Sequence, residues 1–123
     1  MAKVLLYNIR DAEKRMVIKR CLVRLGLPCR EILPEEFGHP LGYLLSLPGF
    51  KAGQSEERFE GEMLVMHALN SLQFGALLDA LRTSNAPVAL KAVVTETNAS
   101  WSSARLYHEL EREHRAFQRK KHP

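Results

Sequence analysis

Polar side chains follow the apolar segments of this sequence, and these residues could do chemistry. His67 ends an apolar segment, and its imidazole could act as an acid, a base or a contact for an anion. Arg10 and the N-termini of helices could hold a small anion or carboxylate, which neutral amides and hydroxyls would orient. The candidate ligand-binding residues are Asn8, Arg10, His67, Asn70, Thr95, Thr97, Asn98 and Trp101.

The same residues have a structural interpretation. Asn70 stands three residues before Gln73, which is the spacing of a capping box at the start of a helix. If Ser102 caps the last helix, Trp101 and Leu106 occupy the two positions of a hydrophobic staple. Caps and turns concentrate at the ends of strands in α/β domains, so both interpretations stay open.

Several kinds of site are not supported by the sequence. The five histidines and two cysteines show no HxxxH or paired-cysteine spacing, so we expect no metal. Residues 8–11 contain no glycine where a dinucleotide would need close approach of the backbone, so we expect no nucleotide cofactor. Cys21 and Cys29 do not follow a predicted strand, which argues against a thiol nucleophile.

The elements that must position these residues alternate along the chain. Apolar or short mixed segments predict strands over residues 4–9, 29–33, 62–69 and 88–95. Apolar periodicity and caps predict helices over 12–25 and 70–82 and from 102 onward, with two helical turns over 40–47. Alternating strands and helices predict a three-layer α/β fold with a mainly parallel, four-stranded sheet.

Charge places the strands within that sheet. The first and third strands are apolar throughout, whereas Arg30 and Glu31 lie in the second and Lys91 in the fourth. Charged strands belong at edges, so we predict the order 2-1-3-4 and a flavodoxin-like or Rossmann-like arrangement. Ligands bind such sheets beyond the carboxyl ends of the strands, where the candidate residues would meet.

The chain fits one domain over residues 1–118, followed by a basic tail over 119–123. Five of the seven glycines fall within an insertion over 35–62. Long polar loops are often lids, and they are as often tolerated insertions, so both roles stay open.

The composition of the chain limits which partners and which cellular location we expect. The net charge of +4 and the basic tail could attract nucleic acid, but no aromatic residues interleave with the tail charges, so we do not favour that partner. No apolar run approaches the roughly 20 residues of a membrane span. With no signal peptide and no CxxC motif, we expect a cytoplasmic protein with reduced thiols.

The residues also carry a family likeness. It lies in Leu5-Leu6-Tyr7-Asn8-Ile9, in Pro40-Leu41-Gly42-Tyr43-Leu44-Leu45, and in Leu90 to Thr95 with Thr97-Asn98, Trp101, Leu106, Glu109-Leu110 and Glu113-His114. With these segments the chain resembles an uncharacterised family of small bacterial proteins, domain of unknown function 3783. The resemblance implies a single bacterial, cytosolic domain and assigns no catalytic residue. Glu96 departs from it, because proline is expected there.

We therefore predict a non-enzymatic module that binds a small anionic ligand or a partner protein where the candidate residues converge, with residues 35–61 folding over it. An enzyme that uses His67 as a general acid or base, with Asn98 and Arg10 holding the substrate, is the first alternative. A nucleic-acid-binding protein is the second. A homodimer also stays open.

Overall fold

A computed structural model describes residues 1–121, and for residues 120 and 121 it describes the backbone alone. The predicted tail over 119–123 lies largely outside the described side chains. The chain divides into two compact units, residues 1–32 with 61–93 and residues 33–60 with 94–123. Among the described residues, no helix is both long and apolar enough to cross a membrane.

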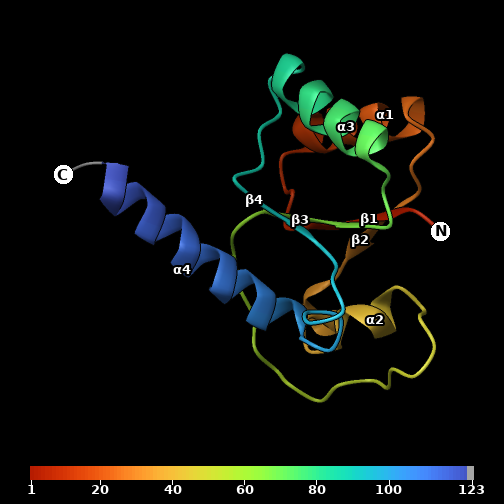
Figure 1. The fold of residues 1–123 in the computed structure, drawn as a ribbon, viewed down its shortest axis with the longest axis vertical. Coiled ribbons are helices and arrows are strands. Elements are labelled where there is room, and N and C mark those ends of the chain that lie inside the picture. Colours follow the sequence, from red (N-terminus) through yellow and green to blue (C-terminus); the bar gives the residue numbers. More distant parts are fainter. Residues whose placement is uncertain (122–123) are drawn as a thin grey trace. The chain divides into compact units, whose positions relative to one another are not determined.

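The first unit contains the sheet (Figure 1). Its elements are β1 (Lys3–Tyr7), α1 (Ala12–Arg24), β2 (Cys29–Ile32), β3 (Met63–His67), α3 (Ser71–Thr83) and β4 (Leu90–Val93). The strand order β2-β1-β3-β4 confirms the prediction from charge, with the two charged strands at the edges. The fold is therefore α/β with a four-stranded sheet.

The orientation of the central strands differs from the prediction. β1 is parallel to β2 and β3 is parallel to β4, but β1 and β3 are antiparallel, with Lys3 opposite His67 and Tyr7 opposite Met63. The sheet is mixed, so the prediction of a mainly parallel sheet was wrong. The cause lies in residues 33–60, which form the second unit instead of a helical crossover. The chain re-enters the sheet at Met63, beside the end of β1.

Helices α1 and α3 cover one face of this sheet (Figure 1). Val4 and Leu6 of β1 and Leu64 and Met66 of β3 point to that face, because side chains alternate along a strand. They form one core cluster with Ile18, Leu22, Leu77 and Leu81 of the two helices. Each such side chain contributes about 1.5–3 kcal/mol when fully buried. The helices are therefore fixed on the sheet by their apolar stripes.

The sheet consists of two similar halves, β1-α1-β2 and β3-α3-β4. In each half a residue with positive φ follows the first strand, Asn8 at 57° and Ala68 at 60°. A side-chain cap starts each helix, Asp11 for α1 and Asn70 for α3, as predicted. Each helix has 13 residues, and the order and directions of the four strands are unchanged by a two-fold rotation.

The two helices also end in the same way. Gly26 and Asn85 have φ of 69° and 53°, the left-handed conformation that closes a helix. The next N–H bonds back into the last turn in both, from Leu27 to the Leu22 oxygen and from Ala86 to the Leu81 oxygen, each at 2.9 Å. A proline then follows in each half. The correspondence allows equivalent positions of the halves to be compared directly.

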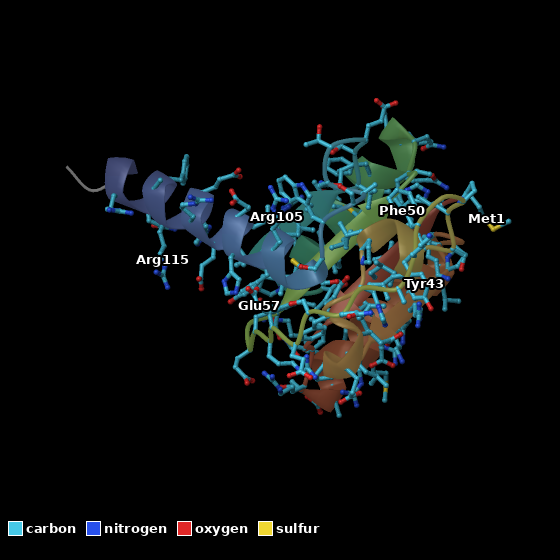
Figure 2. The ribbon with its side chains drawn as sticks, turned by 90° about the horizontal axis from the view of Figure 1, so that it is seen from below. Met1, Tyr43, Phe50, Glu57, Arg105 and Arg115 are labelled. Atoms are coloured by element: carbon cyan, nitrogen blue, oxygen red, sulfur yellow. The ribbon has the colours of Figure 1, made fainter. Side chains whose placement is uncertain are left out.

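The second unit contains a 3-10 helix η1 (Pro34–Glu36), α2 (Leu41–Leu44) and α4 (Ser103–Lys121). Ser102 caps α4 as predicted, because its Oγ accepts the N–H of Arg105 at 3.1 Å. Along the helix, Arg115, which is labelled in Figure 2, pairs with Glu111 at 3.5 Å.

The loop that precedes β3 is anchored within this second unit. Phe59 is buried, and its ring centroid lies 4.3 Å from those of both Phe37 and Tyr107. A Cβ on Gly38 would lie 2.0 Å from the backbone oxygen of Ser55, so only glycine permits this approach. The insertion therefore packs on its own unit. That it closes over a ligand stays a prediction.

Candidate functional site

Two of the predicted site residues lie beyond the end of β1. Asn8 adopts positive φ and its Nδ2 donates to the backbone oxygen of Gly61 at 2.9 Å. Arg10 is exposed, and its Nη2 donates to Asn8 Oδ1 at 3.4 Å. Asn8 thus joins the end of β1 to the chain that enters β3, which is a structural role for its amide.

His67 and Asn70 lie at the opposite end of the sheet, because β3 runs against β1. His67 pairs with Lys3, and four residues of extended strand separate that end from Tyr7, about 14 Å. Arg10 and His67 therefore follow strand ends at opposite edges of the sheet, and not at the shared edge that the sequence predicted. Partial burial lowers the pKa of His67, and the charge of the N-terminal amine of Met1 lowers it further.

Asn70 and Gln73 form the predicted capping box. Asn70 Oδ1 accepts the N–H of Gln73 at 2.8 Å, and Gln73 Oε1 accepts the N–H of Asn70 at 2.9 Å. This reciprocal pair satisfies two donors at the start of α3.

Thr95, Thr97, Asn98 and Trp101 belong to the second unit. The N–H of Thr95 donates to Asn98 Oδ1 at 2.8 Å, and the N–H of Asn98 donates to Thr95 Oγ1 at 3.1 Å. This pair shapes the turn, and Thr97 is exposed on it. Trp101 carries the guanidinium of Arg105 over its ring at 4.2 Å.

The backbone of this turn supports α2. The carbonyl of Trp101 accepts the N–H of Leu41 at 2.9 Å, and that of Ala99 accepts the N–H of Gly42 at 2.8 Å. These carbonyls satisfy donors that the start of a helix leaves without partners inside the helix. The contacts of Thr95 and Asn98 give both residues a structural function. Within the first unit, Asn8 and Arg10 do not meet His67 and Asn70 at one edge of the sheet, since β1 and β3 point in opposite directions.

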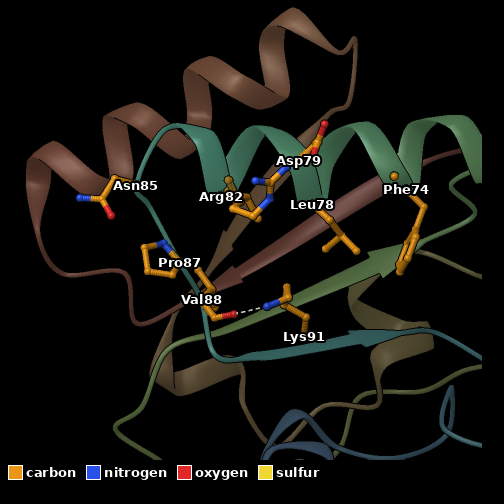
Figure 3. Close-up of a pocket in the computed structure, with 10 residues that line it drawn as sticks. Phe74, Leu78, Asp79, Arg82, Asn85, Pro87, Val88 and Lys91 are labelled. Carbon is orange, nitrogen blue, oxygen red and sulfur yellow. Dashed lines mark hydrogen bonds and ion pairs between the residues drawn. The ribbon is translucent and has the colours of Figure 1, made fainter.

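The first unit contains a groove elsewhere, between α3 and the edge strand β4 (Figure 3). It encloses about 590 Å³. Its residues come from α3, from the turn that follows and from β4: Phe74, Gly75, Leu78, Asp79, Leu81, Arg82, Asn85, Pro87, Val88 and Lys91. Apolar clefts of a few hundred Å³ with a small number of polar groups are the usual form of a ligand site.

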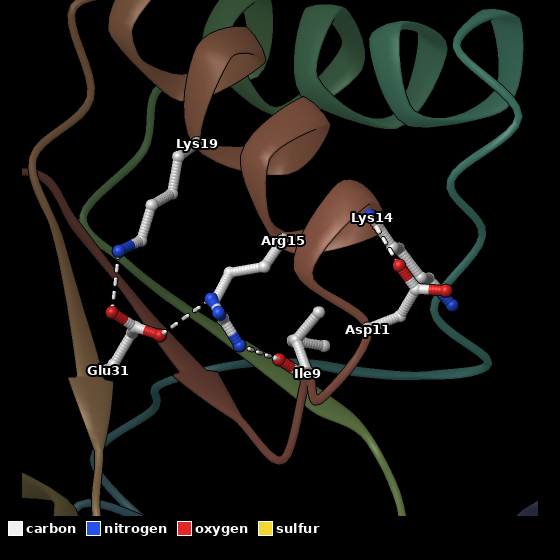
Figure 4. A network of polar contacts seen from close by, with 6 residues as sticks. All are labelled: Ile9, Asp11, Lys14, Arg15, Lys19 and Glu31. Atoms are coloured by element: carbon white, nitrogen blue, oxygen red, sulfur yellow. Dashed lines mark hydrogen bonds and ion pairs between the residues drawn. The ribbon is translucent and has the colours of Figure 1, made fainter.

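A difference between the two halves produces this groove. The fourth and eighth residues of α1 are Arg15 and Lys19, which pair with Glu31 of β2 at 3.6 and 2.5 Å (Figure 4). Their charged side chains thus bridge α1 to the edge strand of that half.

The equivalent positions in the second half are apolar. The fourth and eighth residues of α3 are Phe74 and Leu78, both half-buried. Val93 of β4 pairs with Met66 of β3, which is the position that Glu31 of β2 occupies opposite Leu6 of β1. Val93 is 45% exposed. No ion pair joins these residues, because none of them is charged. Apolar surface is therefore left accessible between the helix and the edge strand.

Polar groups lie at the end of the groove where α3 finishes. Lys91 points to the helix side of the sheet, since its strand neighbour Leu64 belongs to the core there, and its Nζ donates to the backbone oxygen of Val88 (Figure 3). Arg82 forms an ion pair with Asp79 on the exposed rim. The formal charge of these three side chains is +1, which favours an anionic group on a ligand.

From the sequence, residues 70–82 were expected to form a helix and Lys91 to lie on an edge strand. The two features were not joined into a site. The signal was present in the two halves, where residues 15 and 19 are charged and residues 74 and 78 are apolar. Among the described residues, no group of three His, Cys, Asp or Glu side chains could hold a metal ion.

The groove lies within a segment that comparison with known families identifies. Residues 62–117 match the family model of DUF3783, a domain of unknown function. The match confirms the resemblance over these residues, and the segments at residues 5–9 and 40–45 lie outside it. The DUF3783 segment includes β3, α3 and β4, and so every residue that lines the groove. No curated protein and no solved structure matches the chain.

Proposed function

We propose that this protein is a non-enzymatic binding module whose ligand lies in the groove between α3 and β4. The ligand has an apolar body and one anionic group. The observation that carries the proposal is the accessible apolar floor, formed by Phe74, Leu78 and Pro87 beside the ammonium of Lys91. This keeps the small anionic ligand expected from the sequence, but moves it from the ends of the central strands.

The groove supplies both kinds of interaction that such a ligand needs. Burial of an apolar body on the floor contributes about 25 cal/mol for each Å² removed from water. Lys91 now donates to a neutral carbonyl, and a carboxylate would give the ammonium a stronger acceptor of opposite charge. No residue of the groove needs to transfer a proton or form a covalent bond for this function.

Two probes test the proposal, anilinonaphthalene sulfonate as a fluorescent amphiphile and decanoate as its competitor. We expect saturable fluorescence enhancement that decanoate reverses. Leu78→Glu places a carboxylate on the groove floor and should abolish both effects, while circular dichroism and thermal unfolding confirm that the variant is folded. Lys19→Met is the matched control, because it changes the equivalent position in the half that the ion pairs bridge.

The role of Lys91 is tested by comparing decanoate with decanol. Lys91→Met should weaken decanoate about tenfold, the effect of losing one charge-assisted hydrogen bond, and leave decanol unchanged. An equal loss for both ligands would remove the anionic part of the proposal. No binding of either probe at millimolar concentration, or equal binding by Leu78→Glu, would overturn the proposal as a whole.

A further inference from the structure

We infer that the occupant of this groove is the C-terminal end of an extended peptide, which adds to β4 as a fifth strand. The inference rests on the proposed function and names the partner for the same site. It commits to a peptide carboxylate rather than to a free small acid, for three reasons of geometry.

The first reason is the position of β4. It is the last strand of the sheet, and among the described strands it pairs with β3 alone, so no described strand pairs with its other backbone edge. An edge strand offers backbone donors and acceptors to an added strand. A ligand without a backbone, such as a fatty acid, could use the apolar floor but not this edge.

The second reason is the match of lengths. The four residues of β4 extend over about 13 Å, and Phe74 to Arg82 covers about 12 Å along the helix axis. An extended segment of about four residues would therefore lie along the whole groove. Its side chains would point alternately to the groove floor and away from it.

The third reason is the polarity of the groove. Lys91 lies near the start of β4, close to Val88 and to the end of α3, whereas Phe74 lies toward the other end of the groove (Figure 3). A terminal carboxylate near Lys91 requires the peptide to run antiparallel to β4. Antiparallel pairing is also slightly more stable per residue than parallel pairing.

The test is selection from random heptapeptides displayed with a free C-terminus, against the full chain. We expect enrichment of peptides with apolar residues at alternate positions near the C-terminus. In fluorescence anisotropy, amidation of the terminal carboxylate should weaken a selected peptide about tenfold, and Lys91→Met should have the same effect. Hydrogen exchange at the Leu90 to Ala92 amides should slow when the peptide binds.

Leu78→Glu and Lys19→Met are carried through the same selection. Enrichment of the same peptides by Leu78→Glu, or unchanged affinity after amidation, would overturn the inference. If decanoate binds and no peptide is enriched, the groove takes a small acid, which supports the proposed function and overturns the inference of a peptide. If neither decanoate nor any peptide binds, both the proposed function and the inference are overturned.

Discussion

The backbone N–H of Gly53 donates a hydrogen bond to Nδ1 of His39 at 2.9 Å, which joins two distant parts of the insertion over residues 35–62. His39→Ala removes the acceptor, and we expect it to lower the free energy of unfolding by about 1 kcal/mol. Hydrogen exchange at Gly53 should become faster. His114→Ala is the control, because its side chain is exposed on α4. Equal exchange at Gly53 in both variants would contradict the role of His39.

Gly38 is the second point at which the loop depends on one residue type. Because an added Cβ would lie 2.0 Å from the Ser55 oxygen, Gly38→Ala must displace backbone, and we expect a loss of about 1–3 kcal/mol in the free energy of unfolding. Gly75→Ala meets nothing within 4 Å and lies inside α3, so it should stabilise by up to about 1 kcal/mol. Urea unfolding of both variants measures the difference, and similar values would refute the packing argument.

Substitution of Asn70 distinguishes a helix-capping role of this residue from a ligand-binding role. Asn70→Ala breaks the capping box and should cost about 1 kcal/mol in urea unfolding. Its affinity for anilinonaphthalene sulfonate should equal that of the unaltered protein, because Asn70 does not line the groove. Loss of affinity without loss of stability would show instead that Asn70 contributes to ligand binding.

His67 gives the protein a pH dependence of known sign. Its pKa in the folded protein lies below the ordinary value of 6.5, because burial disfavours the charged imidazole and the N-terminal amine repels it. The folded state therefore binds this proton less readily than the unfolded chain does. The resulting stability is fully present above the ordinary pKa and is lost as the pH falls through the lowered pKa.

Nuclear magnetic resonance titration of the His67 ring measures this pKa directly. Urea unfolding above and below it measures the linked stability, and His67→Gln should make the decrease on acidification smaller. A ring that titrates above 6.5 would reverse the predicted sign.

The sequence allowed the strands to be found and ordered, because charge and burial distinguish edge strands from central ones. It did not reveal the direction of β3. A strand buried on both faces, such as Met63–His67, has the same apolar pattern in either orientation. The direction was set by the chain between Ile32 and Met63, which folds as part of another unit. Sequence patterns depend on neighbouring residues, whereas the direction of β3 depends on how a distant part of the chain folds.

The separation of the predicted site residues of the first unit has the same cause. Asn8 and His67 each follow a central strand, but antiparallel strands carry their ends to opposite edges. The local roles were recovered, since the caps at Asp11, Asn70 and Ser102 depend only on neighbours in sequence. The groove depends on which side chain stands across from another in a different element. This pairing of side chains becomes apparent only when equivalent positions of the two halves are compared.

The antiparallel contact between β1 and β3 has a consequence for how such a sheet could arise. Two separate copies of one β-α-β segment would present identical strands to each other and would join as a rotationally symmetric homodimer. A covalent tether between them makes their association independent of concentration. It would also free each copy to diverge, and here one half has charged residues at the positions where the other has apolar residues.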